Sequence, residues 1–159
     1  MGLTSLRSFL RRHKRIALDT SVFIYQLEAN PRYLALTDFI FAWVEREDHA
    51  AITSTITMVE LLVQPYRDSS EQRVNAFYGL LSTYPNLRWI APDLGAADMA
   101  ARIRARHRLR TPDALQAACA AQAQATGLIT NDPVFERVEA FETLVLDQAL
   151  ASKKILPPE

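Results

Sequence analysis

The stretch RIALDTSVFIY, residues 15–25, decides the first step of the fold. Its apolar run ends at Leu18, and Asp19 follows at once, before two hydroxyl residues and a second apolar run. Short apolar runs of this kind are typical of buried strands. In open parallel sheets, ligands bind outside the carboxyl ends of the strands. An acid in this position therefore marks a candidate functional edge.

Four more apolar runs of strand length follow, so the expected strands are 16–18, 50–53, 88–90, 128–130 and 144–146. Segments 31–47 and 70–84 have helical spacing between them. The Ala-rich segment 111–127 has Thr111 as its expected N-cap, Pro112 at the first helical position and Gly127 at its end. This alternation predicts an α/β fold, in which helices cover both faces of a central parallel sheet of about five strands.

A chain of 159 residues suits one domain with a sizeable core. The 18 basic and 18 acidic side chains cancel, which excludes a protein that binds nucleic acid through overall positive charge. Residues 1–15, however, hold five basic groups and no acid. We therefore divide the chain into a basic N-terminal extension, 1–15, a domain, 16–148, and a C-terminal tail, 149–159.

Cysteine usage and hydropathy indicate the compartment. Cys119 is the one cysteine, so no internal disulfide forms. No apolar run approaches the ~20 residues that span a bilayer, and the basic start lacks the apolar segment of a secretory signal. We expect a cytoplasmic protein without a membrane segment.

Four acids have positions that point to one edge of the sheet: Asp19, Glu60, Asp113 and Asp132. Asp132 directly follows the fourth strand, and Glu60 lies within about two helical turns of the second. Asp113 opens the Ala-rich helix, whose other end leads into the fourth strand. We expect the four side chains to lie near one another.

Each acid also has a simpler explanation. Capping or the helix dipole accounts singly for Asp19, Asp113 and Asp132. Thr57 and Glu60 match a capping box. That box is the weakest of these explanations, because Ser54 or Thr55 would cap the helix earlier and place Glu60 further inside it.

The four acids together favour a metal site over four separate caps. Four carboxylates at one edge cannot all stay ionised at pH 7 without a counter-charge. Oxygen ligands without His or Cys favour Mg²⁺ or Mn²⁺ over zinc. One or two such ions would activate water and stabilise the leaving oxygen of a phosphoryl group.

Four segments carry a family resemblance: IALDTSVFIY (16–25), ITSTITMVELL (52–62), LRTPDALQAACA (109–120) and GLITNDPVFERV (127–138). In this order and at these separations they resemble the PIN-domain ribonucleases, most closely the VapC-type toxins of toxin–antitoxin systems. The resemblance covers residues 15–148. Each motif alone is weak, but their order over about 115 residues is a specific signal.

The resemblance implies a single PIN-like domain that hydrolyses RNA phosphodiester bonds with Mg²⁺ or Mn²⁺, water being the nucleophile. It assigns metal binding to Asp19, Glu60, Asp113 and Asp132. It gives Ser21 a role in orienting the first carboxylate, and Thr130 a similar supporting role. Gln116 stands where many relatives have His. The implied partners are an RNA substrate, a small antitoxin and a second copy of the chain.

Two other functions compete with this one. A different metal-dependent phosphohydrolase of the haloacid-dehalogenase type also places Asp after its first strand, but that class needs a second Asp where this chain has Ser21. A non-catalytic relative would bind RNA or protein and use its acids only as caps. All four acids are present, which argues against a decayed catalytic site.

Two basic segments complete the candidates. Possible RNA contacts are Arg102, Arg104, Arg106 and Arg108, which fall on helical lines. The alternative is a solvated helix face on which Asp98 pairs with Arg102. For residues 1–15 we expect a solvated, poorly ordered start, although contact with RNA, with a partner or with the body of the domain stays open.

Overall fold

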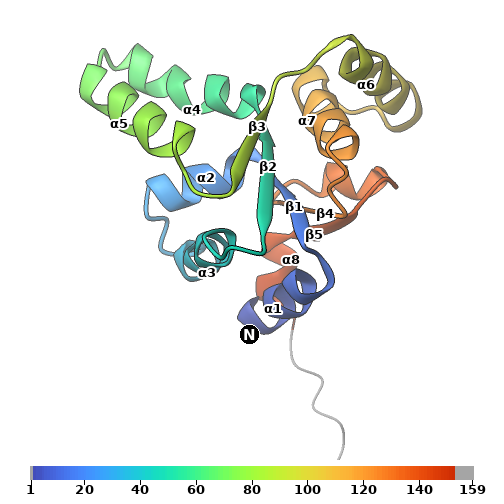
Figure 1. Ribbon diagram of the computed structural model, residues 1–159, viewed down its shortest axis with the longest axis horizontal. Helices are drawn as coiled ribbons and strands as arrows, with labels where there is room; N and C mark the ends of the chain where they lie inside the picture. The colour runs from blue at the N-terminus through green and yellow to red at the C-terminus, as the bar shows by residue number, and fades with distance from the viewer. Residues whose placement is uncertain (1, 153–159) are drawn as a thin grey trace, which may run out of the picture.

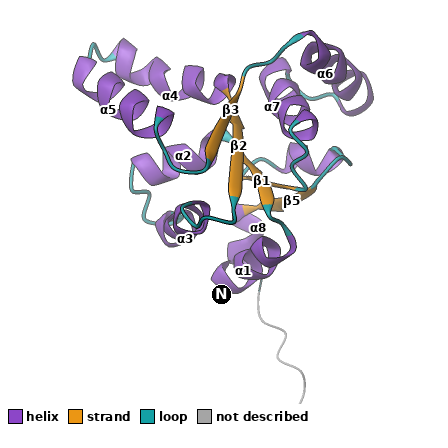
Figure 2. Ribbon diagram, in the orientation of Figure 1, coloured by secondary structure: helices purple, strands orange, loops and turns teal. Residues whose placement is uncertain are grey.

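Five short strands form one fully parallel sheet in the computed structural model, which describes residues 2–152 (Figure 1). The strands are β1 (Arg15–Leu18), β2 (Ala50–Ser54), β3 (Leu87–Ile90), β4 (Gly127–Thr130) and β5 (Glu142–Val145). Their spatial order is β3-β2-β1-β4-β5. Figure 2 shows the strands in orange among the helices that surround them. All five expected strands are confirmed. The last one ends earlier than expected, because Leu146 already begins a helix.

Helices connect and cover the strands. The α-helices are α1 (Gly2–Arg12), α2 (Thr20–Leu27), α3 (Leu34–Val44), α4 (Thr55–Arg67), α5 (Glu71–Ser82), α6 (Leu94–His107), α7 (Thr111–Gln122) and α8 (Leu146–Ala151), and η1 (Pro133–Arg137) is a 3₁₀ helix. The expected helical segments 31–47 and 70–84 contain α3 and α5. Within residues 2–152, none of these helices is long and apolar enough to cross a membrane.

The end of α7 differs from the expectation. Arg110, not Thr111, is the N-cap, and the helix ends at Gln122 because Gln124 adopts a left-handed conformation with φ 60°. Gly127 is therefore no helix end but the first residue of β4. A Cβ atom on Gly127 would lie 2.7 Å from the ring of Phe9, so this close approach of β4 to α1 requires glycine.

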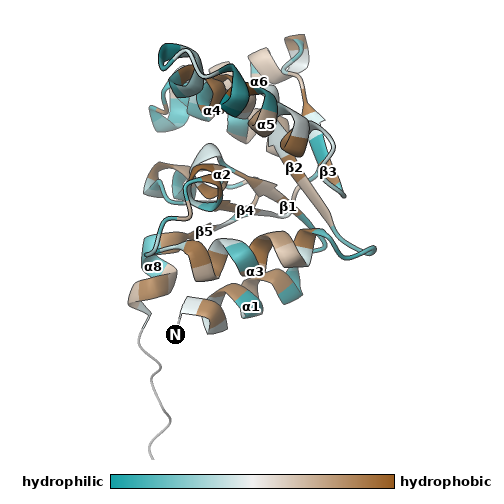
Figure 3. Ribbon diagram, turned by 90° about the vertical axis from the view of Figure 1, so that its left-hand side faces the viewer, coloured by the Kyte–Doolittle hydropathy of each residue, from teal (hydrophilic) through white to brown (hydrophobic). Residues whose placement is uncertain are grey.

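Strand side chains alternate between two cores, one on each face of the sheet. Ile16, Leu18 and Ile129 lie on one face under α1, α2, α3 and α8. Ala17 and Leu128 lie on the other, under α6, α7 and η1. Figure 3 shows α1 and α3 side by side along the first of these faces. The expected arrangement with helices on both faces is confirmed.

The helix α1 overturns the expectation of a poorly ordered start. Leu6, Phe9 and Leu10 repeat at helical spacing and are buried in the core against α3 and α8. His13 fixes the end of this segment, because its ring nitrogens bond Thr126 at 2.8 Å and Glu142 at 2.7 Å. The basic residues lie on the opposite, exposed face of α1. Residues 153–159 of the expected tail lie outside the described residues.

We expect Leu6→Ala to lower the free energy of unfolding by about 2–5 kcal/mol, because Leu6 is 0% exposed and its truncation leaves a cavity. Leu3→Ala is the matched control on the same helix: Leu3 is 37% exposed, so its truncation should cost less than about 1 kcal/mol. Urea denaturation followed by circular dichroism measures both. Equal small losses would mean that α1 does not belong to the core.

Candidate functional site

The site lies at the carboxyl ends of β1 and β4. The chain runs from β1 outward through β2 to β3 and then returns to the other side of β1 as β4, so the strand order reverses here. Crevices at such a switch point are where open α/β sheets bind ligands. Asp19 follows β1 directly, and its backbone N–H donates to the carbonyl of Ile129 in β4 at 3.0 Å. The first carboxylate is thereby tied to both strands.

Asp19 is held by a hydroxyl and does not cap a helix. It occupies the N-cap position of α2 but makes no side-chain capping bond. Instead its Oδ2 accepts a hydrogen bond from Thr130 Oγ1 at 2.8 Å. Burial is the main cause that raises the pKa of Asp19 to about 6, and the charges of Asp113 and Glu60 raise it further, against the opposing hydrogen bonds. The capping explanation for Asp19 is therefore wrong.

Glu60 points toward the same edge from the interior of α4. Ser54 caps this helix, since its hydroxyl accepts from the Ile56 N–H at 3.2 Å, so the capping box of Thr57 and Glu60 does not form. Glu60 Oε1 instead accepts from Thr20 Oγ1 at 3.3 Å. Burial raises the pKa of Glu60, and the charge of Asp113 adds to this effect.

Asp113 lies in the first turn of α7 with its side chain 16% exposed. Burial raises its pKa, and the charge of Asp132 raises it as well. Arg110 Nε lies 3.5 Å from Asp113 Oδ2 and lowers the pKa of this carboxyl. Arg110 also lowers the pKa of Glu60. It is thus a positive charge at an edge that is otherwise acidic.

Asp132 is both an acid of this edge and a cap. Its Oδ1 accepts from the Val134 N–H at 3.0 Å, so the expected capping of the following helix is confirmed. The backbone N–H of Asp132 donates to Thr130 Oγ1 at 3.0 Å. Because the same hydroxyl donates to Asp19, Thr130 joins the two acids that follow β1 and β4. The structure therefore gathers the four expected acids around Asp113, which lies within electrostatic range of Asp19, Glu60 and Asp132.

Ser21 supports the loop after β4. Its hydroxyl accepts from the Asn131 N–H at 3.2 Å, which makes the backbone of this loop its contact. The Asn131 side chain donates to Tyr25 and Tyr33 and accepts from the Asp147 N–H at 2.9 Å. Asn131 thus ties the loop that carries Asp132 to the helices α2 and α8 and to the N-cap of α3. It stands inside the quoted segment GLITNDPVFERV, which was the available signal for it.

A buried polar network lies beneath the acids. Gln116 Nε2 donates to the hydroxyls of Thr20 and Thr57, and its Oε1 accepts from the Ser54 N–H. Thr57 also bonds Thr53 at 2.8 Å. Since Thr20 donates to Glu60, Gln116 supports that acid indirectly. The sequence patterns described above did not predict this network. The hydroxyl residues within 53–57 are the feature of the sequence that could have indicated it.

The arginines of α6 divide into two pairs. Arg102 pairs with Asp98 at 3.1 Å, as the alternative explanation expects. Arg104 donates to the Leu109 carbonyl at 3.0 Å and to the Thr111 hydroxyl, so it holds the turn from α6 to α7. Arg106 and Arg108 are exposed.

The four acids suit a hard cation by their chemistry. All their donors are carboxylate oxygens. Burial chiefly, and the charges of neighbouring acids in addition, raise the pKa of Asp19, Glu60 and Asp113, and a bound cation would favour their ionised forms. Among residues 2–152, no three side chains of His, Cys, Asp or Glu lie close enough together in this structure to hold a metal ion.

A family model described as PIN domain matches residues 16–140. The chain belongs to the PIN domain family, and its single α/β domain with a five-stranded parallel sheet confirms the fold that the resemblance implies. The match leaves α1 outside the shared domain. The division of the chain at residues 15 and 148 stays a prediction.

Similar solved structures are toxin–antitoxin complexes. VapBC from Salmonella typhimurium bound to DNA is 21% identical with a TM-score of 0.64, and covers 83% of this chain and 98% of its own. A toxin–antitoxin complex from Klebsiella pneumoniae is 20% identical with a TM-score of 0.61, and covers 82% and 97%. FitAcB from Neisseria gonorrhoeae is 25% identical with a TM-score of 0.61, with the same coverage. None of the curated proteins matches this chain in sequence.

The pKa of Asp19 predicts a pH-dependent stability. Its folded-state pKa of about 6 lies above the ordinary 3.8, so ionisation of Asp19 destabilises the folded metal-free protein as pH rises from about 4 to about 6. Asp19→Asn should therefore raise the free energy of unfolding at pH 8 by roughly 1–3 kcal/mol, and with it the melting temperature. At pH 4 the increase should be much smaller. Calorimetry in EDTA at both pH values measures this. Asp48→Asn, in an exposed loop, should show no such difference, and an equal effect of Asp19→Asn at both pH values would contradict the prediction.

Proposed function

We propose that this protein is a metal-dependent ribonuclease and the toxin of a toxin–antitoxin pair. The observation that carries the proposal is the gathering of four carboxylates, three of them with raised pKa values, at the switch point of a PIN-domain sheet. Negative charge concentrated at one edge destabilises the folded protein unless an opposite charge, such as a bound cation, neutralises it. Holding a cation for phosphodiester hydrolysis is the use that fits both the donors and the family.

The metal would be bound by Asp19, Glu60, Asp113 and Asp132. One or two Mg²⁺ or Mn²⁺ ions supply a Lewis acid and an activated water at such sites. The chain's own residues hold the carboxylates for this purpose. Thr130 orients Asp19 and fixes the backbone at Asp132, while Thr20 orients Glu60 from above the buried Gln116.

Positive charges beside the acids would hold the RNA. Arg110 lies next to Asp113 and is 83% exposed, so it is free to contact a phosphate oxygen while it partly neutralises the acid. Arg106 and Arg108, which shortly precede Arg110 in the sequence, are exposed and would add positive charge for a phosphate. Arg102 and Arg104 contribute less, because they already hold Asp98 and the turn to α7.

An apolar face on α4 and α5 supports a protein partner. It is lined by Met58, Val59, Leu62, Val63, Tyr66 and Tyr78, and several of these side chains are largely exposed. Exposed apolar patches of this kind mark interaction sites. Since the similar structures are complexes of toxins with antitoxins, we assign this face to a small antitoxin that also covers the acids. The homodimer stays a prediction, and sedimentation of the isolated chain tests it. A cytoplasmic location also stays a prediction, and it agrees with cellular RNA as the proposed substrate.

Purified protein should cut structured cellular RNA in the presence of Mg²⁺ or Mn²⁺, and mapping of the new 5′ ends identifies the target. Asp19→Asn keeps the shape of the side chain but removes a metal ligand, so it should lower cleavage at least about 100-fold. EDTA should abolish cleavage, and Asp48→Asn should leave it unchanged. Cleavage that persists in EDTA or in Asp19→Asn would refute the proposal.

Metal binding is testable without cleavage. A ligand of the folded state raises its stability by mass action, so Mn²⁺ should raise the melting temperature of the wild-type protein and raise that of Asp19→Asn much less. A folded protein that binds Mn²⁺ but cuts only a phosphomonoester would favour the phosphatase alternative. A protein that Mn²⁺ does not stabilise would favour the non-catalytic binder.

A further inference from the structure

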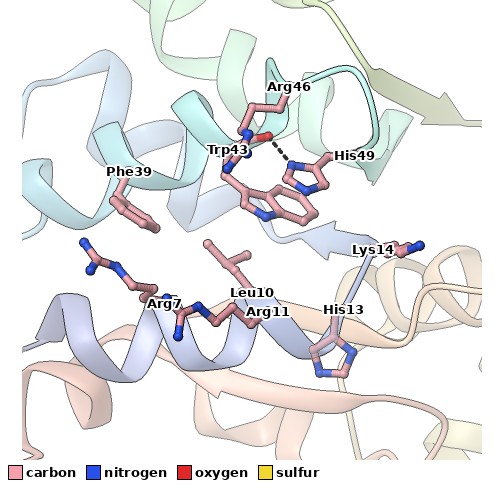
Figure 4. A pocket seen from close by; sticks show the side chains of 9 residues that line it. All are labelled: Arg7, Leu10, Arg11, His13, Lys14, Phe39, Trp43, Arg46 and His49. Carbon is pink, nitrogen blue, oxygen red and sulfur yellow. Dashed lines mark hydrogen bonds between the residues drawn. The ribbon is translucent and has the colours of Figure 1, made fainter.

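A basic cavity, drawn in Figure 4, lies where β1 and β2 begin, whereas the four acids lie at the carboxyl ends of the strands. Its volume is about 370 Å³, and α1, α3 and the loop before β2 form its walls. Lys14 and His49 line it and directly precede β1 and β2. The cavity is thus separated from the carboxyl ends of these strands by their length, roughly 15 Å.

Four cations surround the cavity: Arg7, Arg11, Lys14 and Arg46. All four side chains belong to exposed residues, and within residues 2–152 none of them forms an ion pair. No carboxylate lines the cavity, although Glu47 and Asp48 lie in the same loop as Arg46. Like charges gathered without a counter-charge repel one another, and a bound polyanion would relieve that repulsion.

The interior of the cavity is aromatic and apolar. Leu10 and Trp43 are buried, and Phe39 is partly exposed beneath the guanidinium of Arg7, which lies 5.5 Å from the ring centre. His49 stacks on Trp43 at 3.9 Å and bonds its carbonyl through Nδ1 at 2.7 Å. His13 belongs to the wall but has both ring nitrogens engaged, so it is not available to a ligand.

We propose that this cavity binds one nucleotide of a single-stranded RNA segment that lies outside the cleavage site, with the cations on the adjoining backbone phosphates. The inference rests on the proposed ribonuclease function, whose substrate recognition it extends. Positive grooves with aromatic surfaces are the usual chemistry of single-strand binding. An acidic peptide such as polyglutamate would contact the cations, but it has no ring to pack in the aromatic interior.

The distribution of charge explains why such a site is needed. The cleavage edge carries four carboxylates, which repel the phosphates of the substrate, so much of the binding free energy must come from elsewhere. Arg7 and Arg11 lie one helical turn apart on α1, about 6 Å along the axis, which lets each contact a separate phosphate. Since α1 precedes the matched PIN domain, the wall of this site that α1 supplies is an addition to that domain, while α3 and the loop before β2 belong to it.

Fluorescence anisotropy of a labelled oligouridylate, measured in EDTA with the full-length protein, tests the site without cleavage. The double variant Arg7→Gln/Arg11→Gln should weaken binding about tenfold and reduce the salt dependence by about 1.4 in log–log slope, as expected for two phosphates. The second double variant, Lys14→Gln/Arg46→Gln, removes the other two cations and should weaken binding to a similar extent. It serves as the test if the first variant folds poorly. The matched control is Arg67→Gln/Arg88→Gln, two exposed arginines away from the cavity, which should bind like the wild type.

Each competing outcome has its own reading. Unchanged oligouridylate binding by both cavity variants, folded by circular dichroism, would overturn the proposal. Displacement of the oligonucleotide by UMP at equal concentration would overturn it in favour of a free mononucleotide, and equally tight binding of polyglutamate in favour of an acidic protein. A wild type that binds oligouridylate through the cavity but cuts no RNA would refute the ribonuclease and leave the cavity site standing.

Discussion

The pairing of β1 with β4 is the constraint on which the site depends. This register places Asp19 beside the end of β4, where one hydroxyl, Thr130 Oγ1, donates to its carboxylate and accepts the backbone N–H of Asp132. Two acids from segments more than a hundred residues apart are thereby held at one point. A shift of the register by one residue would turn Thr130 to the other face and separate them.

The edge concentrates charge at a cost that the surrounding structure offsets only in part. Burial and mutual repulsion raise the pKa of Asp19, Glu60 and Asp113, while hydrogen bonds and Arg110 act in the opposite direction. The buried network around Gln116 keeps the strands and helices beneath these acids in place. Such destabilising charge at a rigidly supported position is typical of functional sites.

The net charge of the chain is zero, but the charges are separated: the two ends of the parallel strands carry opposite charge. The carboxylates gather where the strands end, and the cations of α1 and of the loops before β1 and β2 gather where these strands begin. Under the proposed ribonuclease function, a polyanionic substrate would be attracted to the basic side of the molecule and would need a cation at the acidic side. This separation would allow one small domain to hold both the proposed metal site and the proposed site for phosphates.

The sequence by itself determined the strand–helix alternation, the two-faced sheet and the positions of the four acids, because apolar periodicity and strand ends are local patterns. Only the tertiary structure decided that α1 is core, since an amphipathic helix is buried only where α3 and α8 offer it an apolar surface. It likewise decided that Ser21 contacts Asn131, that Gln116 joins buried hydroxyls and that Arg104 holds a turn. The partners of Ser21 and Gln116 are far apart from them in sequence, and Arg104 meets Leu109 and Thr111 only because the chain turns back between α6 and α7, so packing is needed to bring these groups within bonding distance.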